Sequence, residues 1–233
     1  MTELKTETKS SSYVGAKGYT IYKNDISIAL QNEIKEDLNI KPYVSQGEAR
    51  SYPVYRESFK KLYVPRYYGL NKLGSPSSTD IGEGETIHLE FNGQLREKQE
   101  MVVSTYLDYI QHPDKQGGLL ELPCAFGKTI LSLNIISRVS KKTLIIVHKE
   151  FLMNQWIERI EEFLPSAKVG KIQGQIIDID GKDIVIGMLQ SLSMKEYPQS
   201  LFEQFGLTII DEVHHISSEV FSKSLFKIVT RHM

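Results

Sequence analysis

Gly127, Lys128 and Thr129 lie between two apolar stretches, and residues of these types in this order can bind phosphate. A loop of the form G-x-x-x-x-G-K-[ST] points backbone amides and a lysine at phosphate oxygens, while its hydroxyl binds Mg²⁺. Leu122 stands where this pattern has its first glycine, and Ala125 stands where many such loops have another. The pattern therefore predicts a phosphate site, and the alternative is a helix that merely begins with these three residues.

Two residues inside the loop leave its chemistry open. The methyl group of Ala125 would crowd the phosphates if its backbone φ is positive, and it would be harmless if φ is negative. Cys124, the single cysteine of the chain, is either a small apolar residue or a reactive thiol beside a helix N-terminus. We favour the small apolar residue.

Asp211 ends a further apolar stretch, over residues 207–211, and Glu212 follows it directly. Ligands of open α/β sheets bind off the carboxyl ends of strands, so these carboxylates can meet the phosphate loop. Carboxylate and hydroxyl oxygens bind Mg²⁺, and we assign Asp211 and Thr129 to the metal. Glu212 is then the group that orients and deprotonates an attacking water. A solvated acidic turn is the alternative, but the two signals together predict a nucleotide hydrolase.

The elements that must position these residues follow from apolar periodicity. Helices are predicted over 95–110, 128–140, 150–164 and around 217–228. Strands are predicted over 87–91, 117–122, 142–148, 183–188 and 207–211. Apolar strands that alternate with helices predict an α/β fold with a parallel sheet and helices on both faces.

The chain before residue 87 has a different character. We predict a disordered tail over 1–12, a small α+β domain over 13–74 and a linker rich in Gly, Ser and Pro over 75–86. Within the small domain the patterns predict a helix over 26–38 and extended chain over 41–46 and 60–69.

Seven basic and two acidic residues lie in the stretch 41–72, among seven aromatic ones. Basic groups follow a phosphate backbone and aromatic rings stack on bases, so this stretch is a candidate nucleic-acid surface. The alternative is a small domain whose tyrosines pack and whose lysines are solvated. We weigh the two almost evenly, with a slight preference for nucleic acid.

Composition excludes several classes of protein. The 233 residues are 40% hydrophobic with a net charge of −1, so the chain can bury a core and is not uniformly basic. One cysteine excludes an internal disulfide. The polar N-terminus has no signal-peptide pattern, and no apolar run approaches the roughly 20 residues of a membrane helix. We therefore expect a soluble intracellular protein without a membrane partner.

The letters DEVH (211–214) after an apolar strand resemble the D-E-x-H signature of superfamily 2 DExH-box helicases and translocases. Within that superfamily, LPCAFGKT (122–129) resembles the XPB-type group and the similar transcription-associated helicases of large DNA viruses. The resemblance covers residues 87–233 and implies the first RecA-like domain of a P-loop NTPase. It also implies ATP and Mg²⁺ as cofactors, and movement along DNA or RNA, with viral transcription or repair as the favoured process.

The resemblance assigns nucleotide binding to the loop, with Lys128 also in a catalytic role: Pro123, Cys124, Ala125, Phe126, Gly127, Lys128 and Thr129. Gln99, with Arg96 beside it, matches the adenine-recognising segment of the family. The alternative for Gln99 is an ordinary glutamine on a helix surface.

Two further segments resemble the family's contacts with a nucleic-acid backbone. His148 and Lys149 match the first segment, and Gln190 and Ser191 match the second. Solvated loops are the alternative. We expect Trp156, which lies in the helix after the first segment, to pack in the core. His214 matches the residue that couples the nucleotide site to the following motif.

In this family a second RecA-like domain supplies arginines that complete the ATP site, and we expect such a domain after Met233. By themselves the 233 residues should bind nucleotide and hydrolyse it weakly. Transcription machinery is a further candidate partner, and the cytoplasm, the nucleus, the virion or a viral factory are the candidate locations. Two other functions stay open: an inactive, nucleotide-dependent nucleic-acid-binding module, and a P-loop ATPase that does not bind nucleic acid.

Overall fold

The computed structural model describes residues 11–41, 50–112, 115–213 and 228–233. Contacts divide the chain into two compact units, with the boundary between Ile81 and Gly82. The first unit comprises Met1–Ile81 with Ser217–Val229, and the second comprises Gly82–Ile216 with Thr230–Met233. None of the helices in the described ranges is both long and apolar enough to cross a membrane.

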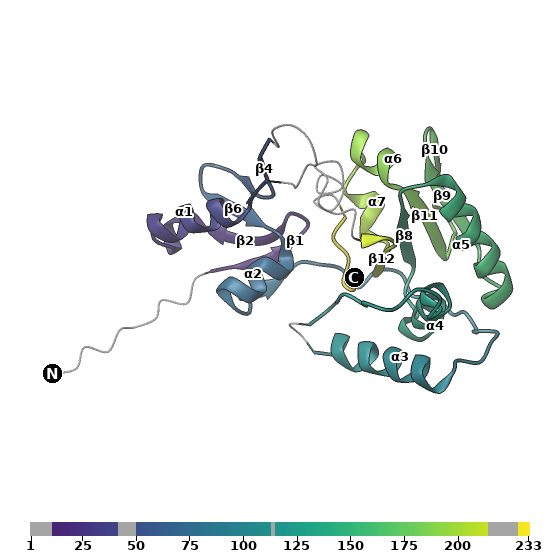
Figure 1. Ribbon diagram of the computed structural model, residues 1–233. Helices are drawn as coiled ribbons and strands as arrows, with labels where there is room; N and C mark the ends of the chain where they lie inside the picture. The colour runs from purple at the N-terminus through teal and green to yellow at the C-terminus, as the bar shows by residue number, and fades with distance from the viewer. Residues whose placement is uncertain (1–10, 42–49, 113–114, 214–227) are drawn as a thin grey trace. The chain divides into compact units, whose positions relative to one another are not determined.

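The second unit is built on a five-stranded sheet with the order β10-β9-β11-β8-β12 (Figure 1). Its strands are β8 (Thr143–Val147), β9 (Val169–Gln173), β10 (Ile176–Asp178), β11 (Ile184–Met188) and β12 (Leu207–Ile210). All neighbours pair in parallel except β10, which is antiparallel to β9. All five residues of β8 are buried, as expected for an apolar strand that is covered on both faces of a parallel sheet.

Helices cover both faces of this sheet, as the sequence predicts. Three of them share one hydrophobic core with Ile145 and Ile186 of the sheet: α3 (Glu97–Ile110), α4 (Lys128–Val139) and α5 (Glu150–Phe163). On the opposite face, α6 (Leu189–Met194) packs closely, because a side-chain carbon added at Gly187 would lie 2.8 Å from Leu192 and 3.4 Å from Leu144. The short helix α7 (Ser200–Glu203) precedes β12. The α/β fold class is therefore confirmed.

The strand predicted over 87–91 is wrong. Ile87 and Leu89 are buried, which accounts for the alternating pattern. However, the backbone amide of Ile87 donates to the carbonyl of Ser140, and the carbonyl of Leu89 accepts from the hydroxyl of Ser137. Both partners belong to the end of α4, so the segment packs against this helix through Ile87 and Leu89 without joining a sheet.

The strand predicted over 117–122 is also absent from the structure. The amide of Gly118 donates to the carbonyl of Met233, and the amide of Met233 donates to the carbonyl of Gln116. On its other side the same short segment pairs with β12, since His232 forms a parallel bridge to Leu207. Residues 230–233 therefore lie between β12 and 116–118, and the two hydrogen bonds to 116–118 are too few to form a regular strand. The predicted helix around 217–228 falls almost wholly outside the described residues.

The first unit has its own five-stranded sheet, with the order β5-β6-β2-β1-β7. Its strands are β1 (Tyr13–Gly15), β2 (Gly18–Tyr22), β5 (Arg56–Glu57), β6 (Lys61–Val64) and β7 (Ser78–Thr79). A separate pair is formed by β3 (Asn39–Ile40) and β4 (Tyr52–Pro53). The short 3₁₀ helix η1 (Lys23–Asp25) precedes α1 (Ile28–Asp37), and α2 (Arg66–Leu73) follows β6. Strand β7 lies within the stretch predicted to be a linker.

Two predictions for this unit need correction. The extended chain predicted over 60–69 is right for β6, but Arg66–Leu73 is a helix. Pro65 occupies its N-cap position, where a missing amide hydrogen costs no helical bond. The predicted disordered tail also extends too far, because Ser11 donates to Asp25, and the hydroxyl of Tyr19 donates to Ser12. Most of the extended stretch predicted over 41–46 lies outside the described residues.

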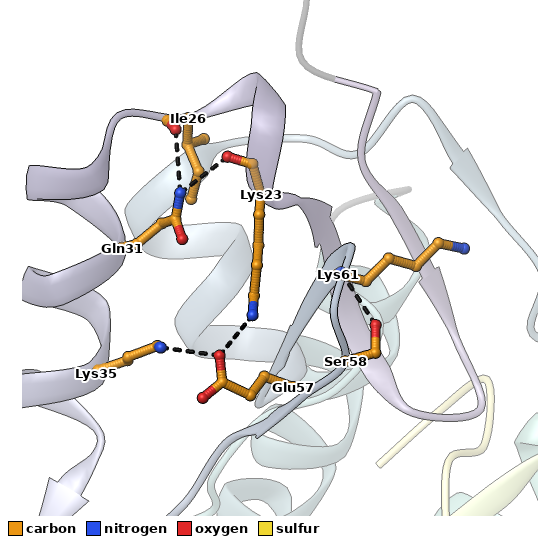
Figure 2. A network of polar contacts seen from close by, with 7 residues as sticks. All are labelled: Lys23, Ile26, Gln31, Lys35, Glu57, Ser58 and Lys61. Atoms are coloured by element: carbon orange, nitrogen blue, oxygen red, sulfur yellow. Dashed lines mark hydrogen bonds and ion pairs between the residues drawn. The ribbon is translucent and has the colours of Figure 1, made fainter.

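Several of the lysines in the first unit have partners within it (Figure 2). The ammonium groups of Lys23 and Lys35 lie 2.6 and 2.8 Å from a carboxylate oxygen of Glu57. Lys72 pairs with Glu33 and Asp37 of α1. At these positions the charges link α1 to the sheet and to α2, which is the role expected in a packed domain. The nucleic-acid surface over 41–72 stays a prediction.

Replacement of Glu57 by Gln should reduce the acid sensitivity of the chain. The hydrogen bonds from Lys23 and then Lys35 hold the pKa of the Glu57 carboxyl below its usual value of about 4.5. A depressed folded-state pKa gives stability above the unfolded-state value and loses it as the pH falls through the folded-state value. Because the pair is partly exposed, we expect a loss of at most about 1 kcal/mol near neutral pH.

Urea unfolding followed by circular dichroism, at about pH 7 and about pH 3, measures this difference. The wild type should exceed Glu57→Gln in stability only at the higher pH. Glu36→Gln is the control, since it removes an exposed carboxylate of α1 for which the described residues provide no ion pair. Equal stability of wild type and Glu57→Gln at both pH values would contradict the prediction.

Candidate nucleotide and nucleic-acid site

Three neighbouring strands end at the same edge of the second unit's sheet. Ile145 of β8 pairs with Ile186 of β11 on one side and with Ile209 of β12 on the other, all in parallel. The carboxyl ends of these strands therefore carry the candidate residues that follow each strand: Gln190 and Ser191 after β11, His148 and Lys149 after β8, and Asp211 and Glu212 after β12.

The phosphate loop follows the same edge. Residues 230–233 run parallel to β12, and the hydrogen bonds of Met233 with Gln116 and Gly118 have the parallel pattern. The chain from Gln116 therefore runs in the direction of β12 and enters the loop 123–129 at the carboxyl edge. Asp211 and Lys128 thus belong to one side of the sheet, as the sequence predicts.

The loop has the backbone of an anion-binding turn. Gly127 has a φ of 99° and is the N-cap of α4, with no capping side chain among the described residues. The first amides of α4, from Lys128 onward, have no acceptor within the helix, so they can donate to a phosphate at its N-terminus. Lys128 is exposed and Thr129 is half-buried in the first turn.

Arg96 and Gln99 hold this loop from α3. The Gln99 amide nitrogen donates to the carbonyl of Phe126 at 2.8 Å, and an Arg96 guanidinium nitrogen donates to the same oxygen at 2.7 Å. The Gln99 amide oxygen accepts from the amide of Arg96 at 2.9 Å. Gln99 is only 4% exposed, which excludes the alternative of an ordinary surface glutamine. Contact with an adenine ring stays a prediction.

Gly127 is required by its position as well as by its φ. A side-chain carbon there would lie 2.6 Å from the amide nitrogen of Gln99. Ala125, in contrast, has a φ of 60°, a region that alanine adopts only at a cost. The question left open by the sequence is therefore answered: the loop requires a positive φ at Ala125. Its neighbour Cys124 is exposed rather than packed.

Asp211 and Glu212 have different surroundings. The amide of Asp211 donates to the carbonyl of Ile146, which extends the β12–β8 pairing by one residue. A carboxylate oxygen of Asp211 accepts a hydrogen bond of 2.9 Å from the indole nitrogen of Trp156. Trp156 is 4% exposed and belongs to the core, as predicted, but the sequence did not reveal this bond. Glu212 is exposed and has a φ of 57°.

The candidate nucleic-acid residues hold adjacent loops together. The Gln190 amide nitrogen donates to the carbonyl of His148 at 2.9 Å, which joins the ends of β11 and β8. The hydroxyl of Ser191 accepts from the amide of Gly174 at 2.9 Å. Lys149 is the exposed cation of the set and the N-cap of α5. His214 lies outside the described residues.

The residues at this edge fit a magnesium-bound nucleotide. The described residues contain no cluster of three His, Cys, Asp or Glu side chains that would hold a metal by themselves. Mg²⁺ commonly takes one or two carboxylates together with phosphate oxygens and water, so a site that includes Asp211 and Thr129 needs no such cluster. The uncapped amides of α4 would face the phosphates.

A family model described as "Type III restriction enzyme, res subunit" matches residues 92–232, which is more than half of the chain. The chain belongs to this family. The matched region includes the phosphate loop, the acidic pair and both candidate nucleic-acid segments. The family assignment confirms the superfamily 2 helicase resemblance drawn from the two nucleotide motifs.

Curated relatives are viral proteins with helicase names. A protein of Acanthamoeba polyphaga mimivirus, named "Putative ATP-dependent RNA helicase", is 34% identical over 93% of this chain and 43% of its own length. A "Putative helicase" of Invertebrate iridescent virus 3 is 26% identical over 92% of this chain and 70% of its own length. The chain thus spans less than half of the mimivirus relative.

Solved structures agree on the fold. The SWI2/SNF2 ATPase core domain of Sulfolobus solfataricus has a TM-score of 0.53 and 14% identity over 65% of this chain and 34% of its own. T4 UvsW has a TM-score of 0.51 and 18% identity over 87% of this chain and 48% of its own. The second unit therefore has the fold of a RecA-like domain.

Replacement of Ala125 by Gly should stabilise the chain. An L-residue in the left-handed region costs about 1–2 kcal/mol, which glycine avoids. Glycine in turn loses more backbone entropy on folding, which costs about 0.5–1 kcal/mol and offsets part of that gain. The net gain should reach up to about 1 kcal/mol in the free energy of unfolding, measured by urea denaturation. Ala167→Gly, the same change at a residue without a positive φ, should destabilise. A loss of stability in Ala125→Gly would contradict the prediction.

Proposed function

We propose that this chain binds Mg-ATP and a nucleic-acid backbone at one edge of its RecA-like sheet, as the nucleotide-binding part of an ATP-dependent helicase or translocase. One observation carries the proposal. The proposal is supported by the parallel register, because the candidate phosphate loop, the acidic pair and the two candidate nucleic-acid segments all lie at the same edge. The helicase names of the viral relatives support it.

The roles follow from what each side chain can do. The loop Pro123–Thr129 would surround the phosphates, with Lys128 as a compact positive charge on the outer ones. Thr129 and Asp211 would hold Mg²⁺, which supplies Lewis-acid neutralisation of the phosphate oxygens. Glu212, exposed after Asp211, would orient the attacking water and take its proton.

The protein would contact the sugar–phosphate backbone of the nucleic acid rather than its bases. Lys149 and the amides at the start of α5 are donors that suit phosphate oxygens. Gln190 and Ser191 would fix the shape of the neighbouring loops, because both already bond to backbone groups there. Such contacts carry no base preference, so DNA and RNA are distinguished only by experiment.

Hydrolysis that drives movement would need further parts. In P-loop enzymes an arginine finger raises the rate by about 10³–10⁵. We infer that a second RecA-like domain supplies such arginines, in keeping with the greater length of the mimivirus relative. Viral transcription or repair is the process that this function fits best.

Ala125 is the observation that favours a second candidate, a nucleotide-dependent binding module without hydrolysis. Its φ of 60° shows that the loop adopts a conformation natural to glycine. The loop has this conformation without a nucleotide, so its cost of about 1–2 kcal/mol lowers the stability of the fold rather than the affinity for phosphate. The methyl group of Ala125 is the feature that would crowd the phosphates. The family match and the helicase names of the viral relatives favour an active site of the two.

Lys128→Ala tests the nucleotide site. Loss of the phosphate-binding charge should weaken the binding of a fluorescent Mg·ADP analogue by at least about tenfold. Lys115→Ala is the matched control, because this exposed lysine precedes Gln116 and so lies at the opposite edge of the sheet. It should bind the analogue like the wild type.

Glu212→Gln completes the experiment, since it should retain nucleotide binding while turnover falls below that of the wild type. Equal affinity of wild type and Lys128→Ala would remove the loop from the site. Unchanged turnover in Glu212→Gln would favour another base.

Lys149→Ala tests the nucleic-acid contact. It should weaken binding to single- and double-stranded DNA and RNA of one sequence to a similar degree, because a phosphate contact does not read bases. The slope of log K against log salt concentration should fall in magnitude by about 1. Fluorescence anisotropy across a salt series measures both, with Lys115→Ala again as control. An unaltered slope would place the contact elsewhere.

A further inference from the structure

The bond between Trp156 and Asp211 joins two parts of the site that the proposed function treats separately. Asp211 ends β12, while Trp156 lies in the middle of α5, 55 residues earlier in the chain. The indole nitrogen donates to one carboxylate oxygen of Asp211 at 2.9 Å. A carboxylate has a second oxygen, so this bond leaves the other oxygen available to a cation.

We propose that Trp156 is a positioning residue for the metal-binding carboxylate of Asp211. An indole nitrogen donates only and does not titrate near neutral pH, so its bond fixes the carboxylate without competing for the cation. Hydrogen-bonded partners behind a metal ligand orient it and set its affinity for the metal. This inference rests on the proposed function, because it takes Asp211 as a ligand of Mg²⁺.

The burial of Trp156 restricts the movement of its indole ring, which holds the carboxylate of Asp211. It is 4% exposed, and its neighbours on the same face of α5, Met153 and Ile160, are 2% and 0% exposed. The three side chains belong to the core that α5 shares with the sheet. The indole therefore has little freedom to turn, and neither has the carboxylate bonded to it.

The same helix reaches the candidate nucleic-acid segment. Lys149 is the N-cap of α5, and Trp156 follows seven residues later, which is about 10 Å along the helix axis. The donor to Asp211 and the candidate phosphate contact therefore belong to one helix.

Trp156→Phe separates positioning from packing, because it keeps an aromatic ring and removes the donor. The measurement is the binding of a fluorescent ADP analogue at a series of Mg²⁺ concentrations and in EDTA. The Mg²⁺ concentration that gives half of the Mg²⁺-dependent increase in analogue binding should rise about 10- to 100-fold, while the affinity for the analogue in EDTA stays unchanged. Ile160→Val, which loosens the same core without removing a donor, should alter neither value.

The proposal is overturned if Trp156→Phe needs the same Mg²⁺ concentration as the wild type, or if its affinity falls equally with and without Mg²⁺. The second result would show that the indole only packs. The proposed function fails separately, when Lys128→Ala binds the analogue like the wild type. Absence of binding in the wild type would refute both.

A second measurement needs no variant, because Trp156 is the single tryptophan of the chain. A divalent cation on Asp211 would be the largest charge near the indole and should change its fluorescence. Titration of Mg²⁺ into the wild type in the presence of ADP should therefore alter the emission over the same Mg²⁺ concentrations that promote ADP binding. Unchanged emission during Mg·ADP binding would contradict the proposal, even if Trp156→Phe fails to fold.

Discussion

The parallel pairing of β11, β8 and β12 is the constraint on which the candidate site depends. The candidate side chains follow the last residue of each strand. How close they lie to one another therefore depends on the register in which the three strands pair. In this register Ile145 and Ile186 belong to the core that the sheet shares with α3, α4 and α5, and a slip of one strand by one residue would turn its isoleucine toward the opposite face. Apolar burial within the sheet thus sets the positions of polar groups that never enter it.

Most of the elements around the site could be predicted because their patterns are strong and local. Helices α3, α4 and α5 have apolar residues at helical spacing, and β8, β11 and β12 are short apolar runs. The two false strands, over 87–91 and 117–122, also carry apolar residues, but their backbone partners are the end of α4 and residues 230–233. An apolar pattern does not reveal which backbone groups a segment will pair with, and Leu119 shows that it does not always indicate burial. Arg66–Leu73 was missed because its aromatic residues also suit a strand.

The candidate site could be predicted by residue type and only partly by geometry. The resemblance singled out Gln99 as a candidate for contact with adenine, but its hydrogen bond to the carbonyl of Phe126 was not foreseeable. The positive φ of Ala125 was one of two alternatives, and only the surrounding fold decides between them. Trp156 could be assigned to the core, but its bond to Asp211 depends on how α5 crosses the sheet.

Residues 230–233 attach the segment before the phosphate loop to the sheet, and this has a consequence for the order of folding. During synthesis the segment 116–118 emerges long before the residues that pair with it, while α3 and α4 can form from local contacts. Contacts between distant parts of a chain form slowly, so the loop should take its place only after the rest of the sheet has formed. A ligand that recognises the completed loop would then stabilise the finished domain without accelerating the earlier steps. The phosphate loop, which carries candidate catalytic residues, is therefore expected to reach its folded position after the rest of the sheet.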